Sequence, residues 1–138
     1  MAGEFQREAD VERALRPGNR IAMVGLSSKP ERDSYQVASY LMEKGFDVVP
    51  VNPTEQEILG RTCYPDLLAV PGDVDVVDIF RQPDEVGPIV EEAARIGART
   101  LWLQLGVVNE TAARRAREAG LVVVMDLCMK EEHTRRRR

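Results

Sequence analysis

Long apolar runs are missing from this sequence, and so are other marks of membrane and secreted proteins. Its apolar runs, such as residues 121–125, are far shorter than the roughly 18 apolar residues that a transmembrane helix needs. The charged N-terminal segment does not contain the apolar core of a signal peptide, so we expect a cytoplasmic protein with no membrane partner. Cysteine is scarce as well. Cys63 and Cys128 are the only two and form no C-x-x-C pair, which favours reduced, largely buried thiols.

An excess of positive charge is also missing. The chain has 19 basic and 23 acidic residues, a formal net charge of −4, so neither a general surface for polyanions nor a nucleic-acid partner is expected. Residues 135–138, four consecutive arginines, are the exception and predict a solvated basic tail. The length of 138 residues and the hydrophobic fraction of 43% fit one globular domain, which we place at residues 1–134.

The sequence does contain a pattern that occurs three times: an amphipathic helix, a glycine and then an apolar, β-branched run. Glycine just past a helix end supplies a left-handed C-cap, and a strand that is apolar throughout is typical of a parallel sheet buried on both faces. Two more apolar runs, residues 21–26 and 74–80, complete five predicted strands. The other three strands and their preceding glycines are 46–51 after Gly45, 100–105 after Gly97 and 121–125 after Gly120.

Amphipathic helices are expected between these strands, and an extra N-terminal helix at about residues 4–15. The connection 52–73 contains three prolines and is expected to hold one short helix around residues 64–68. Alternating strands and helices imply right-handed crossovers. The predicted fold is therefore α/β: a single doubly wound Rossmann-like domain with a five-stranded parallel sheet in the order 3-2-1-4-5. Candidate N-caps of the helices are Asp33 or Ser34, Asp84 and Asn109.

Ligands of such a sheet bind beyond the carboxyl ends of the strands, where the strand order reverses. Here the sequence places small, hydroxyl and basic residues at these ends, including Gly25, Ser27, Arg32 and Arg81. Gly25 permits close backbone approach, although any tight turn would also use a glycine. The basic side chains and the positive end of the next helix favour a phosphate or pyrophosphate.

The sequence motifs of the common nucleotide sites are absent. Residues 25–30 contain only the first glycine of G-x-G-x-x-G, and Asn52 stands after the second strand where an acidic residue would hold the ribose of NAD. The pattern G-x-x-x-x-G-K-[ST] is missing too, so hydrolysis of ATP or GTP has no support.

Taken in order, the motifs of this chain resemble those of the stand-alone CoA-binding proteins, whose domain is similar to the N-terminal CoA-binding domain of the succinyl-CoA synthetase α subunit. The resemblance runs from about residue 21 to residue 133. It implies coenzyme A, free or as an acyl-CoA, as the bound cofactor. It implies no complete catalytic machinery, because the phosphorylated histidine of the synthetase belongs to a second domain. The family usually has an arginine where this chain has Leu127, so the contact of that arginine is not carried over. The matching segments are residues 24–34, 40–41, 50–53, 77–81, 102–107 and 125–133.

The resemblance also assigns roles to individual residues. It implies phosphate contacts from the first loop, an adenosine end bordered by Asn52 and Pro53, and an opposite wall that faces the pyrophosphate and pantetheine and includes Phe80 and Arg81. No catalytic or metal-binding residue is predicted. The complete set of expected cofactor-binding residues is Gly25, Leu26, Ser27, Ser28, Lys29, Arg32, Asn52, Pro53, Phe80, Arg81, Leu103, Gln104 and Gly106.

Two other functions remain open on the sequence alone. One is a small nicotinamide-dependent oxidoreductase, which the missing acidic residue disfavours. The other is a regulatory or interaction subunit that uses the fold as a scaffold and could form a homodimer. The single histidine, His133, is expected to be structural or solvent-facing. Asp75, Asp78 and Asp126 are expected to make structural hydrogen bonds or caps and not to hold a metal.

Overall fold

A five-stranded parallel sheet forms the centre of the computed structural model, which describes residues 2–137. Every strand pairing in this sheet is parallel. The strands are almost wholly buried, as expected for a sheet covered on both faces, and the predicted parallel α/β fold is confirmed. In chain order the strands are β1 (Arg20–Val24), β2 (Asp47–Val51), β5 (Val76–Ile79), β6 (Thr100–Leu103) and β7 (Val122–Met125).

The spatial order of the strands is β2-β1-β5-β6-β7, which in chain order reads 2-1-3-4-5. One parallel bridge, between Val51 and Tyr64, lies on the outer side of β2, where the third strand of the expected order would lie. With that bridge counted as a minimal third strand, the order is 3-2-1-4-5 followed by one more strand. The expected winding is therefore confirmed. The strand formed within residues 74–80 lies beside β1, however, whereas the expected order placed it beside β2.

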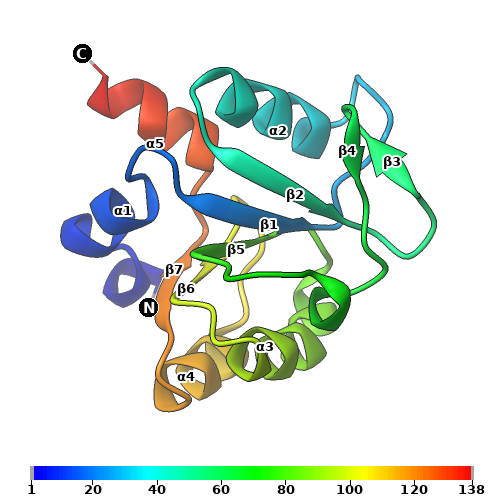
Figure 1. The fold of residues 1–138 in the computed structure, drawn as a ribbon. Coiled ribbons are helices and arrows are strands. Elements are labelled where there is room, and N and C mark those ends of the chain that lie inside the picture. The colour runs from blue at the N-terminus through cyan, green and yellow to red at the C-terminus, as the bar shows by residue number, and fades with distance from the viewer. Residues whose placement is uncertain (1, 138) are drawn as a thin grey trace.

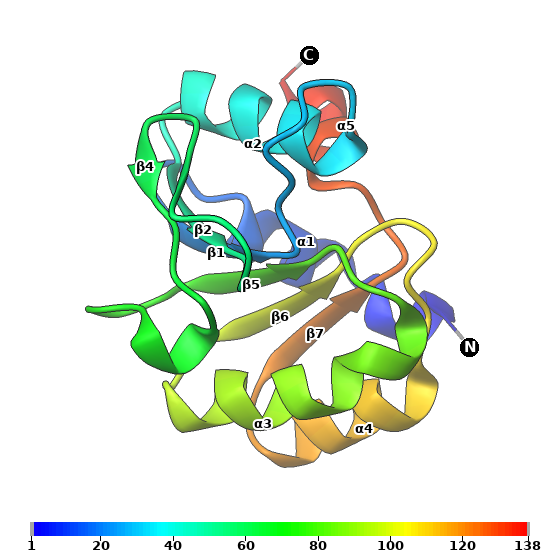
Figure 2. The same cartoon turned by 90° about the vertical axis from the view of Figure 1, so that its right-hand side faces the viewer.

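Two layers of helices enclose the sheet (Figures 1 and 2). Helices α1, α2 and α5 pack on one face, and α3 and α4 pack on the other, each layer with its own buried apolar cluster. The chain after β1 turns to α2 on the first face, whereas the chain after β5 turns to α3 on the second, so the strand order reverses between β1 and β5. The helices are α1 (Glu8–Ala14), α2 (Asp33–Glu43), α3 (Val86–Arg95), α4 (Glu110–Glu118) and α5 (Met129–Arg136), with short 3-10 helices at Ala2–Phe5, Leu67–Ala69 and Pro83–Glu85.

Helices α2, α3 and α4 all end as the sequence pattern predicts. Gly45, Gly97 and Gly120 have positive φ angles, and after each glycine a backbone N–H reaches back five residues, for example from Phe46 to the carbonyl of Leu41 at 3.0 Å. This hydrogen bond belongs to the Schellman motif, which satisfies carbonyls at a helix end.

Only one of the predicted N-caps is confirmed: the side chain of Asn109 accepts a hydrogen bond from the N–H of Ala112 at 3.0 Å. Arg32, not Asp33 or Ser34, is the N-cap residue of α2. Asp84 lies inside the 3-10 helix that precedes α3, where Gln82 and Glu85 form a capping box instead.

The connection between β2 and β5 contains a hairpin that the sequence pattern did not predict. Strands β3 (Glu57–Ile58) and β4 (Arg61–Thr62) pair antiparallel, and Leu59 and Gly60 between them both have positive φ angles. The short helix expected around residues 64–68 is a 3-10 helix at Leu67–Ala69, capped by the carboxylate of Asp66, which accepts from the N–H of Ala69 at 3.0 Å.

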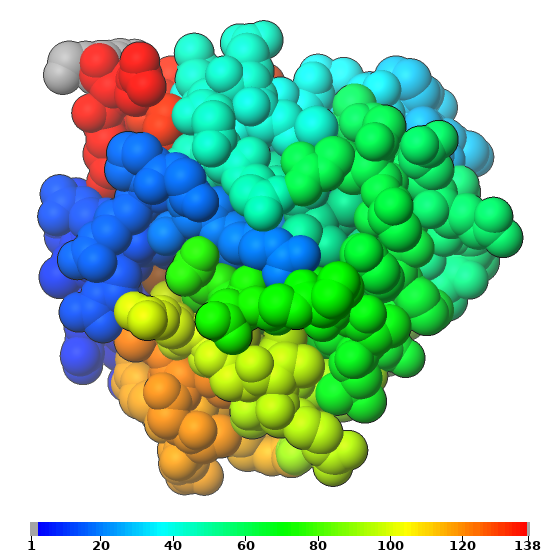
Figure 3. All heavy atoms as spheres, viewed as in Figure 1, coloured from blue at the N-terminus to red at the C-terminus, as the bar shows by residue number. Residues whose placement is uncertain are grey.

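The two ends of the chain lie side by side. Figure 3 shows the N-terminal segment, in blue, next to the C-terminal helix, in red. An ion pair between Arg136 and Glu8 at 2.5 Å links α5 to α1, and the amide of Gln6 donates to the carbonyl of Met125 at 3.0 Å, beside β7. Helix α5 includes Arg135 and Arg136, the first two residues of the expected basic tail, while Arg138 lies outside the described residues. Among residues 2–137, no helix is long and apolar enough to cross a membrane.

Candidate functional site

The loop after β1 passes close to the end of β5, and Gly25 makes this approach feasible. Its φ angle is +88°, and a Cβ at this position would lie 2.2 Å from the carbonyl oxygen of Phe80. The N–H of Gly25 still bonds to the carbonyl of Val51 at 2.9 Å, so the chain leaves the sheet directly afterwards. The loop is then fixed to α2, because the N–H of Ser27 donates to Oγ of Ser34 at 3.0 Å. The first loop therefore has one well-defined shape at the point where the strand order reverses.

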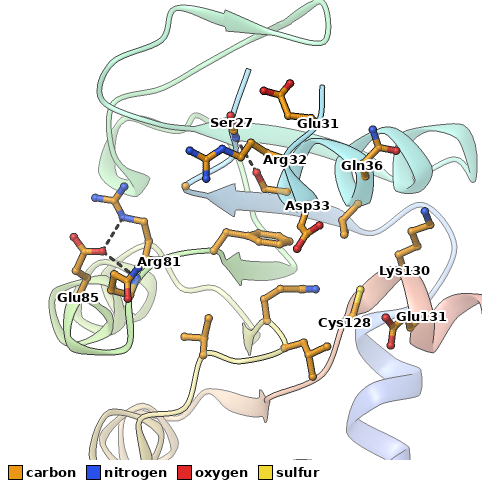
Figure 4. Close-up of a pocket in the computed structure, with 18 residues that line it drawn as sticks. Ser27, Glu31, Arg32, Asp33, Gln36, Arg81, Glu85, Cys128, Lys130 and Glu131 are labelled. Atoms are coloured by element: carbon orange, nitrogen blue, oxygen red, sulfur yellow. Dashed lines mark hydrogen bonds and ion pairs between the residues drawn. The ribbon is translucent and has the colours of Figure 1, made fainter. Parts of the chain in front are cut away.

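A cavity of about 810 Å³ opens at this point, beside the first turns of α2 and α5. Figure 4 shows its labelled side chains: Ser27, Arg32 and Arg81 lie towards one end, and Cys128, Lys130 and Glu131 lie towards the other. The floor includes Phe80 and Gln104, which follow β5 and β6 directly. The cavity thus extends along the carboxyl edge of the sheet from β1 to α5.

A second cavity, of about 430 Å³, lies on the other side of the same edge, beside α3. Its walls combine apolar residues, among them Pro53, Pro65 and Ile89, with Arg81 and four carboxylates. The two cavities share Gly25, Arg81 and Glu85, so they meet where β1 and β5 end. A ligand with two ends could therefore place one end on each side of this shared point.

Charge in the larger cavity is mixed. Arg32, Arg81 and Lys130 are opposed by four carboxylates, two of which are Glu85 and Glu131. The Nε atom of Arg81 lies 3.6 Å from a carboxylate oxygen of Glu85, and the same oxygen accepts a hydrogen bond from the N–H of Gln82 at 3.0 Å. A phosphate that binds here must therefore compete with Glu85 for Arg81.

The structure places about half of the expected cofactor-binding residues at the cavities. Gly25, Ser27, Arg32, Phe80, Arg81 and Gln104 line the larger one, and Pro53, with Gly25 and Arg81, lines the smaller one. Leu26, Ser28, Lys29, Asn52, Leu103 and Gly106 line neither of the two cavities.

Each of the remaining expected residues has a structural environment that accounts for its position. Leu26 and Leu103 are fully buried in the core. Asn52 connects two loops, because its amide donates to the carbonyl of Leu26 at 3.0 Å and its oxygen accepts from the N–H of Thr54 at 2.9 Å. The hydroxyl of Ser28 donates to Glu55 at 3.1 Å.

Two others among these residues are engaged through their backbone. The N–H of Gly106 donates to Asp126 at 2.7 Å. The N–H of Lys29 donates to Oγ of Ser27 at 3.0 Å.

Sequence reasoning missed four cavity residues at the start of α2, which are Asp33, Ser34, Gln36 and Val37. A second group of missed residues comes from the start of α5: Cys128, Lys130 and Glu131. Residues 125–133 are one of the segments that resemble the CoA-binding family, and this resemblance is the signal that could have identified the three residues near the start of α5. Leu127, where the resemblance expects an arginine, instead packs against the core, and its carbonyl accepts a hydrogen bond from Nε1 of Trp102 at 2.7 Å.

Two of the three aspartates make the structural hydrogen bonds that were expected of them. Asp75 accepts from the N–H of Arg20 at 2.8 Å, and Asp126 accepts from that of Gly106. Asp78 does not: neither carboxyl oxygen has a hydrogen-bond partner among the described residues. Complete burial raises the pKa of Asp78 well above its usual value. Residues 2–137 contain no cluster of side chains suited to a metal ion.

His133 has the structural role that was expected of it. It is buried, and its Nδ1 lies 2.7 Å from the hydroxyl of Tyr40. Its ring also meets the ring of Phe46 edge to face. Burial lowers the pKa of this histidine, so the neutral ring is favoured near neutral pH.

Comparison with known proteins gives a consistent result. A family described as CoA binding domain matches residues 19–134. An uncharacterized protein of Bacillus subtilis, YneT, is 37% identical over 126 residues, which cover 91% of this chain and 93% of that protein. The α subunit of an ADP-forming acetate–CoA ligase of Pyrococcus furiosus is 30% identical over 99 residues, which make up 71% of this chain but only 22% of the subunit.

The solved structures agree with the fold. A hypothetical protein from Pyrococcus horikoshii superimposes with a TM-score of 0.87 at 45% identity, over 93% of this chain and 89% of that one. A protein described as PH1109 redesigned for binding gives a TM-score of 0.88 at the same identity and coverage.

Proposed function

Because this chain belongs to the family of CoA binding domains, we propose that it binds coenzyme A, free or as an acyl-CoA, across the carboxyl edge of its sheet. The observation that carries this proposal is the pair of cavities that meet at Gly25 and Arg81. Coenzyme A has a matching division, since a pyrophosphate joins an adenosine 3′-phosphate to a long pantetheine chain.

The chemistry of the walls supports one orientation. The smaller cavity, with Pro53, Pro65 and Ile89, offers apolar surface for the adenine. Gly25 brings backbone close to the shared point, and Arg32 and Arg81 supply positive charge there for the pyrophosphate. The pantetheine then extends through the larger cavity towards Cys128.

The proposal is a binding function and does not include the activity of the ligases. This chain aligns with 22% of the acetate–CoA ligase subunit, and a domain of that size accounts for one part of a larger enzyme. Coenzyme A is favoured over NAD because the end of β2 carries Asn52, and the amide of Asn52 is already engaged with Leu26.

Arg81→Ala provides the test. Loss of a charge-assisted hydrogen bond should weaken coenzyme A binding by about 1.5–3 kcal/mol. Adenosine 3′,5′-bisphosphate, which lacks the pyrophosphate and pantetheine, should lose clearly less. Arg95→Ala is the matched control, because Arg95 is exposed at the end of α3 and lines neither cavity.

Calorimetric titration of both ligands against the three proteins supplies these values, and thermal unfolding with coenzyme A or NAD supplies an independent check. Saturating coenzyme A should raise the unfolding temperature, since selective binding to the folded state raises apparent stability. Stabilisation by NAD without stabilisation by coenzyme A would overturn the proposal. Equal losses for the two ligands with Arg81→Ala would show that Arg81 does not contact the pyrophosphate side.

A further inference from the structure

The floor of the larger cavity contains a polar side chain whose hydrogen bonding is incomplete. Gln104 follows β6, lines the cavity and is only 5% exposed. Its oxygen Oε1 has no hydrogen-bond partner among residues 2–137. A buried amide oxygen without a partner costs free energy, and a half-turn of the Gln104 amide group would direct this oxygen into the cavity, where a donor can bind it. The amide N–H groups of a pantetheine chain are donors of the required kind.

The cavity wall near the start of α5 also carries a thiol. Cys128 is the N-cap residue of α5 and is 9% exposed. Figure 4 shows its sulfur directed into the cavity, at the end opposite Arg81. It forms no disulfide.

The other cysteine lies in a different environment and serves as an internal comparison. Cys63 lines neither of the two cavities, and its Sγ donates to the carbonyl of Asn52 at 3.5 Å. Burial raises the pKa of this thiol, which disfavours its reactive thiolate form. The chain therefore has one cysteine directed into the cavity and one outside it.

We propose that Cys128 undergoes thiol–disulfide exchange with disulfides of coenzyme A, and that Gln104 positions the pantetheine chain for this reaction. The inference rests on the proposed function, because the anchored pyrophosphate holds the pantetheine in the larger cavity. Oε1 of Gln104 accepts a hydrogen bond from a pantetheine amide. The sulfur at the end of that chain then lies beside Cys128.

The reaction balances without any further oxidant. The thiolate of Cys128 attacks the coenzyme A sulfur of a disulfide between coenzyme A and a second thiol. The new bond joins Cys128 to coenzyme A, the original S–S bond breaks, and the second thiol leaves as a thiolate that takes up the proton lost by Cys128. One disulfide is consumed and one is formed, so the number of electrons is conserved.

Anchoring gives the reaction its selectivity. A disulfide bound through its adenosine and phosphates presents its sulfur to Cys128 at a high effective concentration. Oxidised glutathione has no such anchor and must reach a largely buried thiol from solution. We therefore expect coenzyme A disulfide to react at least about tenfold faster than oxidised glutathione at equal concentration.

Intact-mass spectrometry after incubation with coenzyme A disulfide tests the inference. The expected product carries one coenzyme A less two hydrogen atoms, peptide mapping assigns it to Cys128, and a reducing thiol removes it. Cys128→Ser should abolish the adduct, whereas Cys63→Ser should keep it. Gln104→Leu should slow its formation, and circular dichroism checks that each variant is folded.

The outcomes separate this inference from the function on which it rests. If coenzyme A stabilises the protein but its disulfide does not modify Cys128, the exchange reaction is refuted and the binding function stands. Modification of Cys63 in preference to Cys128, or equal rates with oxidised glutathione, would also refute the inference. If coenzyme A does not stabilise the unmodified protein, the proposed function itself fails. The comparison of the two disulfides needs only the unmodified sequence, so it remains decisive even if a variant does not fold.

Discussion

Asp78 should make the stability of this protein fall as the pH rises, which is the reverse of the usual behaviour of a carboxylate. The residue lies in the middle of β5 between Met23 of β1 and Trp102 of β6. Both neighbours are 0% exposed, and so is Asp78. Burial raises its pKa well above the usual value of 3.8, so the folded protein keeps the proton at pH values where the unfolded chain loses it.

The sign and size of the effect follow from proton linkage. Below pH 3.8 both states hold the proton, and the group has no pH-dependent effect. Above that value the unfolded chain binds one proton fewer than the folded protein. The free energy of unfolding therefore decreases by about 1.4 kcal/mol per pH unit until the pH approaches the raised pKa of the folded state.

The replacement Asp78→Asn isolates this contribution, because asparagine has nearly the same shape and does not titrate. Urea unfolding at several pH values between about 4.5 and 6.5 gives the free energy of unfolding of both proteins. The difference, parent minus Asp78→Asn, should fall as the pH rises, by about 1.4 kcal/mol for each pH unit that stays below the raised pKa of Asp78. Asp75→Asn is the control: Asp75 lies just before the same strand, with its carboxylate hydrogen-bonded to Arg20.

A constant difference between the parent and Asp78→Asn would refute the reasoning, since it would mean that Asp78 is ionised in the folded protein. A fall of the same size for Asp75→Asn would refute it as well. In that case the pH dependence would not come from the buried group.

Two further replacements test the site. Gly25→Ala should lower both stability and coenzyme A affinity, because the added Cβ would lie 2.2 Å from the carbonyl oxygen of Phe80. Gly97→Ala is the control. Gly97 also has a positive φ but has open space around it, so this replacement measures only the backbone strain, which is roughly 1 kcal/mol. Urea unfolding should show a clearly larger loss for Gly25→Ala, and equal losses would exclude the steric explanation. Glu85→Gln should tighten coenzyme A binding several-fold, because it removes the charge that competes for Arg81 and keeps an oxygen for the capping hydrogen bond. Calorimetric titration measures this change, and unchanged or weaker binding would show that the ion pair does not compete with the ligand.

The sheet could be predicted from the sequence because its five strands are apolar and three of them follow a glycine-capped helix. The strand ends could not. The runs 21–26 and 100–105 predict longer strands than β1 and β6, which end at Val24 and Leu103. At the first, the positive φ of Gly25 turns the chain out of the sheet. The residues just past these strand ends line the cavities. The strand ends were therefore predicted least accurately next to the candidate site.

Helix α5 could not be predicted because its stability comes from contacts distant in sequence. It is strongly charged, and Met129 is its one fully buried apolar side chain. Arg136 pairs with Glu132 one turn earlier at 2.8 Å and with Glu8 of α1. The partner in α1 is 128 residues away, and no local pattern indicates such a pair.

The mixed charge of the larger cavity indicates how the chain could distinguish coenzyme A from other polyanions. With a net charge of −4, the protein does not attract anions in general. Leu127 replaces the arginine that the family resemblance leads one to expect, which leaves Arg32 and Arg81 as the basic residues nearest the shared point of the cavities. A free phosphate would contact only these two, against the carboxylate of Glu85. In the binding mode that we propose, coenzyme A would gain further contacts in both cavities. Its whole length would then offset the cost of competing with Glu85, and selectivity would follow from shape and not from charge alone.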